Sequence, residues 1–238
     1  TRMPAMSESA AQLPLAVQLR DEATFDNFLF FGELGALRSA LDLAVEQGGE
    51  SFIFLHGPPG SGCSHLLQAA CQALPSGQAL YLPLAQLTEM PAEELLADVE
   101  QMQLVCLDNL EAITGKPEWE QAMFNLCNRA RAEHCRLLFA ASQSPRNLQI
   151  ALPDLQSRLA WGLVMQLPEV DDDLKLEVLR FRAARRGLEM PEDVGRYIMT
   201  RSSRSLVELI AVLEQLDRAS MVHQRQLSIP FVKASLSW

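Results

Sequence analysis

Eight residues between a strand-like run, Ser51 to His56, and a helix-like run from His65 have the spacing of a phosphate-binding loop. They read Gly57-Pro58-Pro59-Gly60-Ser61-Gly62-Cys63-Ser64. The two outer glycines let the backbone curl so that its N–H groups point at a phosphate, and the N-terminus of the helix adds its positive end. The serine stands where such loops place a hydroxyl that touches magnesium. We expect this loop, together with His65, to hold a nucleotide; a plain Gly/Pro turn is the alternative.

Cysteine occupies the position at which such loops carry a lysine that reaches the β- and γ-phosphates. The thiol of Cys63 is mostly neutral at an ordinary pKa of about 8.5, and ionising it would bring a negative charge to the phosphates. The loop is therefore expected to hold a diphosphate better than it handles a γ-phosphate.

A second motif, which contains an acidic residue, follows the buried run Leu104 to Leu107. Asp108 ends this strand at the edge of a parallel sheet where ligands bind, so that with Ser64 it is placed to hold Mg²⁺, through a water. The next residue, Asn109, cannot act as a base. The site is thus predicted to bind nucleotide and to be poorly equipped for hydrolysis, although a strand-ending turn would read the same way.

Short apolar runs alternate with helical patterns over residues 23–168, which predicts an α/β domain with a five-stranded parallel sheet covered on both faces. Pro91 and Pro117 are placed as first-turn prolines of two of the helices. The expected strands are Ser51–His56, Ala79–Leu82, Leu104–Leu107, Leu137–Ala141 and Leu163–Gln166. The expected helices are Leu34–Val45, Ser64–Leu74, Ala92–Met102 and Glu118–Glu133.

Strand signals stop after Pro168, and residues 169–238 predict a small all-helical domain. Its expected helices are Asp171–Arg186, Pro191–Thr200, Ser203–Ser220 and one from Pro230 to the end. Arg204 opens the third of these, where an arginine does not serve the helix dipole, so it is a candidate to reach a phosphate. Residues 1–22 are expected to form a flexible arm, rich in Ser, Ala, Gln and Pro.

Composition narrows the classes of function. The 238 residues are 48% hydrophobic and 21% charged, with a net charge of −10, which argues against a broad duplex-binding surface. No run approaches the ~18 apolar residues of a membrane span, and no signal-peptide pattern is present, so we expect a cytoplasmic protein without a membrane partner. The five cysteines are an odd number without metal-type pairing and are expected to be buried reduced thiols.

The motifs together resemble the AAA+ nucleotide-binding module and, within it, the family of the bacterial replication initiator DnaA. The similarity runs from Ala23 to the C-terminus. It rests on Ala23-Thr24-Phe25-Asp26-Asn27-Phe28, Gly62-Cys63-Ser64-His65-Leu66-Leu67, Ser157-Arg158-Leu159-Ala160-Trp161-Gly162-Leu163 and Arg204-Ser205-Leu206.

The resemblance implies roles for residues outside the loop. Arg158 matches the arginine finger, which is offered to nucleotide on a neighbouring subunit, and Arg204 matches the second sensor, which reads the protein's own nucleotide. Ser142 with Gln143 falls where the first sensor sits, but the family carries an acid at the latter position. Phe25 and Phe28 lie in the segment that borders the base in this family, and a core role suits them equally.

The N-terminal arm adds a partner. Its cluster Gln12-Leu13-Pro14-Leu15 is similar to the short peptides that dock on the replication sliding clamp, and we expect no DNA-binding domain, since the chain stops at Trp238. The combination resembles regulatory members of the family that inactivate the initiator.

The resemblance therefore implies an adaptor that holds a nucleoside diphosphate, with ADP the first candidate. The adaptor docks on the DNA-loaded clamp and triggers ATP hydrolysis on DnaA through Arg158, with no sequence-specific DNA contact of its own. A homodimer that hides Arg158 stays open. The alternatives are a self-contained ATPase of the helicase-loader or clamp-loader type, which would turn over ATP alone, and an initiator fragment that opens DNA.

Overall fold

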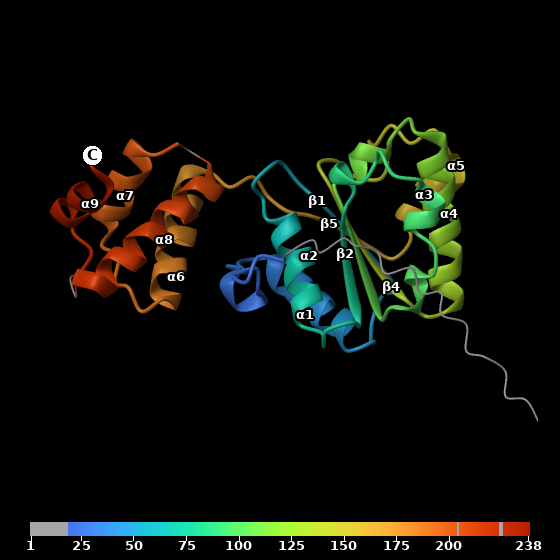
Figure 1. The fold of residues 1–238 in the computed structure, drawn as a ribbon, viewed down its shortest axis with the longest axis horizontal. Coiled ribbons are helices and arrows are strands. Elements are labelled where there is room, and N and C mark those ends of the chain that lie inside the picture. The colour runs from blue at the N-terminus through green and yellow to red at the C-terminus, as the bar shows by residue number, and fades with distance from the viewer. Residues whose placement is uncertain (1–18, 204, 224–225) are drawn as a thin grey trace, which may run out of the picture.

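The computed structural model describes residues 19–203, 205–223 and 226–238, and its larger part is built on a parallel sheet (Figure 1). The five strands follow the order β2-β3-β4-β1-β5. The expected α/β class, sheet and helical lid are confirmed. The strands are β1 Phe52–His56, β2 Ala79–Pro83, β3 Leu104–Asp108, β4 Arg136–Ala141 and β5 Leu163–Gln166.

Alternate residues of the central strands enter two separate apolar cores, one on each face of the sheet. On β1, Ile53 and Leu55 pack beneath α1 Leu34–Val45 and α2 Cys63–Gln72, whereas Phe52 and Phe54 face the opposite layer. That layer contains α3 Ala92–Leu95, α4 Pro117–Ala132 and α5 Pro153–Leu159 (Figure 1). Burial on both faces explains why the strands read as continuous apolar runs.

The helix expected over Ala92–Met102 is wrong in its length. It ends at Leu95, and the chain reaches a separate 3₁₀ turn through Asp98, whose φ is +57°. Pro91 precedes this helix as its N-cap, whereas Pro117 does occupy the first turn of α4, as expected. The 3₁₀ turns are η1 Phe25–Asn27, η2 Leu84–Gln86, η3 Val99–Gln101 and η4 Leu110–Ile113.

The C-terminal part is helical and has its own apolar core. Asp171 caps its first helix by accepting from the Leu174 backbone N–H at 2.8 Å, and Gly187 follows that helix with a φ of +73°. The helices are α6 Asp172–Arg185, α7 Glu192–Arg201, α8 Leu206–His223 and α9 Ile229–Leu236. Over the described ranges, no helix combines the length and apolarity needed to cross a membrane.

Candidate nucleotide-binding site

The predicted phosphate loop joins β1 to α2, and its geometry requires glycine at both outer positions. Gly62 caps α2 with a φ of +102°, and a Cβ there would lie 2.6 Å from the Phe28 ring. A Cβ on Gly57 would lie 2.7 Å from the Ser61 hydroxyl oxygen and 2.8 Å from the Leu167 carbonyl oxygen. The first N–H groups of α2 have no acceptor within the helix, so the loop presents unpaired donors to an anion.

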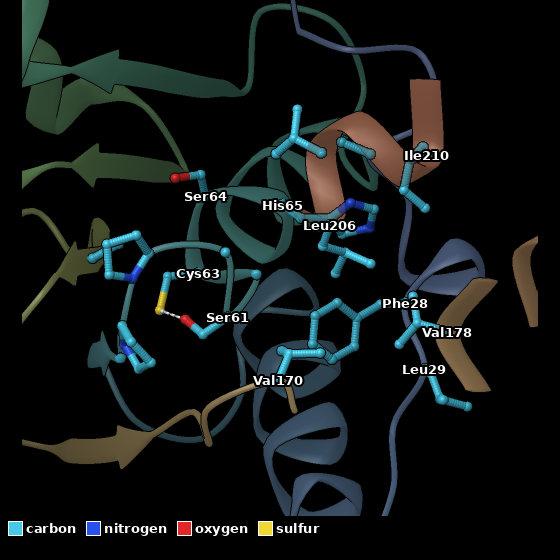
Figure 2. A pocket seen from close by; sticks show the side chains of 18 of the residues that line it. Phe28, Leu29, Ser61, Cys63, Ser64, His65, Val170, Val178, Leu206 and Ile210 are labelled. Carbon is cyan, nitrogen blue, oxygen red and sulfur yellow. Dashed lines mark hydrogen bonds between the residues drawn. The ribbon is translucent and has the colours of Figure 1, made fainter. Parts of the chain in front are cut away.

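A cavity of about 790 Å³ opens over this loop, which is within the usual range for a small-molecule site. The sheet edge, the N-terminal segment and the lid all contribute to its wall. Figure 2 shows Ser61, Cys63 and Ser64 on the loop side, while apolar side chains from the N-terminal segment and the lid line another side. These apolar residues are Phe28, Leu29, Val170, Val178, Leu206 and Ile210. The cavity therefore joins an anion-binding end to an apolar end, which fits a nucleotide.

Cys63 is a neutral thiol in this setting. Burial raises the pKa of Cys63 to about 11, and the negative charges of Asp108 and Glu111 act in the same direction. Its sulfur lies 3.5 Å from the Ser61 hydroxyl (Figure 2), and this contact lowers the pKa but does not offset burial. The loop consequently offers neither a cation nor a thiolate to the phosphates.

The carboxylate of Asp108 is already hydrogen-bonded. Tyr81 donates its hydroxyl to Oδ2 at 2.6 Å, and the Asn109 backbone N–H donates to Oδ1 at 2.9 Å. Asp108 is only 3% exposed, and burial followed by the Asp108 charge raises the pKa of Tyr81. Each oxygen keeps one lone pair for a water, so Ser64 and Asp108 fit a magnesium ion that is held mainly by phosphates. No cluster of three metal-ligating side chains occurs in the described ranges.

Two residues that sequence reasoning missed complete this edge. Tyr81 carries no local signal, since 27 residues separate it from Asp108. Glu111 lines the cavity and accepts from the Ser142 backbone N–H at 3.3 Å; its acidic type three residues after Asp108 was an available signal. Ser142 lines the cavity as well, whereas exposed Gln143 is not among the lining residues.

The N-terminal segment is tied to the loop through His65. Its ring Nε2 lies 2.9 Å from the Thr24 carbonyl oxygen and so donates to it, and its ring lies 5.7 Å from that of Phe28. Burial is the main cause that lowers the pKa of His65. The two expected aromatic residues separate here, because Phe28 lines the cavity whereas Phe25 is buried in the core under Arg38.

The lid is fastened to the same segment by ion pairs that the sequence did not indicate. Arg182 of α6, 4% exposed, donates to Glu22 Oε2 at 2.6 Å and to the Asn27 carbonyl oxygen at 2.9 Å. Arg186 donates to the other oxygen of Glu22. The residues involved lie at least 155 positions apart in the chain, which explains why no local pattern reveals them.

Arg158 lies at the opposite end of the sheet from the phosphate loop. It precedes β5, which runs parallel to β1 and starts beside Ile53, whereas the loop follows the other end of β1 at His56. A five-residue strand spans about 16 Å. The described residues that line the cavity include none from α5. The remaining predicted residues, Arg204 and Gln12 to Leu15, lie outside the described residues.

A phosphate loop on a five-stranded parallel sheet, followed by a helical lid that borders the nucleotide cavity, defines the AAA+ class of proteins. Two family models divide this chain. The bacterial DnaA ATPase domain matches residues 19–166, which is more than half of the chain, and the domain described as "Hda, lid domain" matches residues 172–236. The chain belongs to the bacterial DnaA ATPase-domain family and carries an Hda-type lid.

Solved structures show the same fold. Domain III of the Thermotoga maritima initiator DnaA is 21% identical, with a TM-score of 0.71, over 92% of this chain and 97% of that chain. AMPPCP-bound DnaA from Aquifex aeolicus is 22% identical, with a TM-score of 0.66, over 83% of this chain and 65% of that chain. The Thermotoga maritima RuvB branch migration motor is 16% identical, with a TM-score of 0.62, over 92% of this chain and 72% of that chain. This chain thus spans about two thirds of the longer DnaA structure.

Proposed function

We propose that this protein is a negative regulator of replication initiation that stimulates ATP hydrolysis by DnaA. In this proposal it carries a nucleoside diphosphate, ADP, in its own cavity and docks on the DNA-loaded sliding clamp through Gln12, Leu13, Pro14 and Leu15. Arg158 then enters the nucleotide site of DnaA as an arginine finger and converts that protein to its inactive ADP form. An arginine supplied in trans accelerates hydrolysis by stabilising the charge on the transferring phosphoryl group.

The position of Arg158 is the observation that carries the proposal. The arginine lies at the end of β1 and β5 that is remote from its own phosphate loop, so it is available to another subunit's nucleotide and not to its own. The Aquifex DnaA structure contains AMPPCP, an ATP analogue, so a member of the family provides such a triphosphate as the target.

The protein's own site supports retention of nucleotide without turnover. Cys63 is neutral, Asp108 is bonded to Tyr81, and Asn109 follows it in place of a second acid. In the proposal, the backbone and Ser64 bind the phosphates, and Arg204 reads them from the lid. A magnesium ion, where bound, neutralises phosphate charge. Steady ATP turnover by the purified protein alone would instead favour the self-contained ATPase.

The remaining partners follow from charge and placement. A net charge of −10 favours recruitment to DNA through the clamp over direct duplex contact, and we propose a cytoplasmic location. A homodimer that covers Arg158 would store the protein in an inactive state until the clamp and DnaA compete for it.

The decisive experiment replaces the finger. Arg158→Ala should reduce stimulated hydrolysis by DnaA, in the presence of clamp loaded on DNA, by about 10³-fold or more. Folding, clamp binding and ADP binding should remain as in the native protein. Arg180→Ala, which removes an exposed arginine from α6, is the matched control for net charge. Full stimulation by the Arg158 variant would refute the proposal.

A further inference from the structure

Two guanidinium groups, one of them that of Arg158, lie against the same indole ring at the end of the sheet that is remote from the phosphate loop. The guanidinium carbon of Arg158 is 4.0 Å from the centroid of Trp161, and that of Arg131 is 4.4 Å from it. Both distances are well inside the ~6 Å over which a cation is attracted to a ring face. Arg131 comes from the last turn of α4 and Arg158 from the last turn of α5, so two different helices deliver the two charges to one residue.

Among the described residues, the two charges have no counter-charge. In the parts of the chain that the structure describes, no carboxylate lies within ion-pair distance of either arginine. The Nε atom of Arg158 is buried and has no hydrogen-bond partner there. Like charges repel at this range, and a buried donor without a partner costs free energy. In a protein with a net charge of −10, such an uncompensated pair favours an external anion as its partner.

The indole is placed by a constrained backbone and by a contact with the sheet core. Gly162, which follows it, has a φ of +72° and no room for a Cβ, because the Phe52 carbonyl oxygen fills that space. The Trp161 ring also packs 6.4 Å from the ring of Phe52, a residue of the sheet core. Arginine side chains lose up to about 2 kcal/mol of rotamer entropy when they are ordered. A fixed aromatic face that orders them beforehand removes part of that cost from the step in which they bind an anion.

We propose that Trp161 is a positioning residue for Arg158 and that Arg131 supplies a second guanidinium to the same polyphosphate, the triphosphate bound on the neighbouring AAA+ subunit. This inference rests on the proposed function. Guanidinium forks match phosphate oxygens in a bidentate fashion, and Arg131 is exposed at this end of the sheet. Trp161 acts on the rate through the placement of Arg158 and has no contact of its own with the reacting atoms.

The test compares variants in the stimulated hydrolysis assay, with the maximal rate and the half-saturating concentration measured separately. Trp161→Leu should lower the maximal rate by about 10- to 100-fold, because the finger loses its fixed direction. Trp161→Phe keeps an aromatic face and should retain most of the rate. Arg131→Ala should lower the maximal rate about tenfold. Arg180→Ala again controls for the loss of one charge.

The outcomes separate the two levels of the proposal. If Arg158→Ala abolishes stimulation while folded Trp161→Leu keeps the native maximal rate, the positioning role is wrong and the proposed function stands. An equal loss of maximal rate in Trp161→Phe and Trp161→Leu also shows that the aromatic face does not position Arg158. If Arg131→Ala has the same maximal rate as Arg180→Ala, Arg131 does not supply a second guanidinium to the phosphates. If the leucine variant does not fold, Trp161→Phe and Arg131→Ala carry the test, since a native rate in the exposed Arg131 variant overturns the paired-arginine site.

Discussion

At the scale of single residues, the chemistry of the phosphate loop depends on the protonation of Cys63. A lysine there would contribute a fixed positive charge, whereas this thiol lies in a buried position flanked by acids. In the proposed function, the loop therefore binds phosphate through its backbone N–H groups and Ser64, without a side-chain cation of its own, and the proposed cation, Arg204, belongs to the lid segment. If Arg204 has this role, affinity for nucleotide depends on the position of the lid.

The raised pKa of Cys63 makes its reactivity predictable. With a pKa of about 11, roughly one thiol in a thousand is ionised at pH 8. We expect alkylation of Cys63 by iodoacetamide, mapped by mass spectrometry, to be slow at neutral pH and to rise about tenfold per pH unit between pH 7 and 9.5. A rate that levels off between about pH 8.5 and 9, near the ordinary pKa of a thiol, would contradict this expectation, and the denatured protein supplies that reference.

Residues that are close in sequence were open to prediction, and residues that meet only after folding were not. The loop Gly57 to Ser64 and the strand end at Asp108 could be identified because spacing along the chain fixes their geometry. Tyr81, the partner of Asp108, comes from a different strand. The pairing of Arg182 with Glu22 requires the lid to be docked, and no property of a local segment contains that information.

At the scale of elements, strands were predicted better than helices. All five strands match to within one residue at each end. In the central strands β1, β3 and β4, burial on both faces leaves an unbroken apolar run. The helix from Ala92 is shorter than the sequence predicts. The prediction was too long because the acidic and apolar residues keep helical spacing through the turn at Asp98. The short helix α5 was not expected; Pro153 at its start and the buried Leu155 and Leu159 were its signals.

The junction between α5 and β5 offers a stability prediction at this scale. Gly162→Ala should destabilise the protein by about 3 kcal/mol in chemical denaturation, since a positive φ and a collision with the backbone of Phe52 add together. Gly77→Ala is the matched control. Its φ is +83°, but no atom lies within 4 Å of a Cβ there, so only the backbone cost of about 1 kcal/mol applies. Equal losses of unfolding free energy in the two variants would show that the contact with the Phe52 backbone has no effect.

At the scale of the whole molecule, the ion pairs of Glu22 hold the lid against the α/β domain. Burial alone would raise the pKa of Glu22, but the hydrogen bond and charge of Arg186, with those of Arg182, lower it below its usual 4.5. A lowered carboxyl pKa stabilises the folded state above pH 4.5, and that contribution is lost as the pH falls through the folded value.

Glu22→Gln tests this fastening. Because solvent screens the partly exposed carboxylate, we expect a loss of about 1 kcal/mol at pH 7 in thermal unfolding. The difference from the native protein should persist at pH 4.5 and close at lower pH, when the native carboxyl is itself protonated. Asp26→Asn removes the exposed pair with Arg185 and should have a smaller effect at every pH. A difference that is independent of pH would show that charge is not the cause.

The placement of the phosphate loop and Arg158 at opposite ends of β1 also gives the molecule a polarity. In the proposed function, the Arg158 end donates an arginine to a neighbouring subunit. Contacts that joined this end to the phosphate-loop end of the next molecule would pair unlike surfaces and could continue in one direction. A two-fold symmetric dimer that buries Arg158 of both copies is closed and cannot continue in this way, because neither copy then has an exposed Arg158. The symmetry of the protein's contacts, rather than their strength, would then decide whether it forms an inactive dimer or acts on a neighbouring subunit.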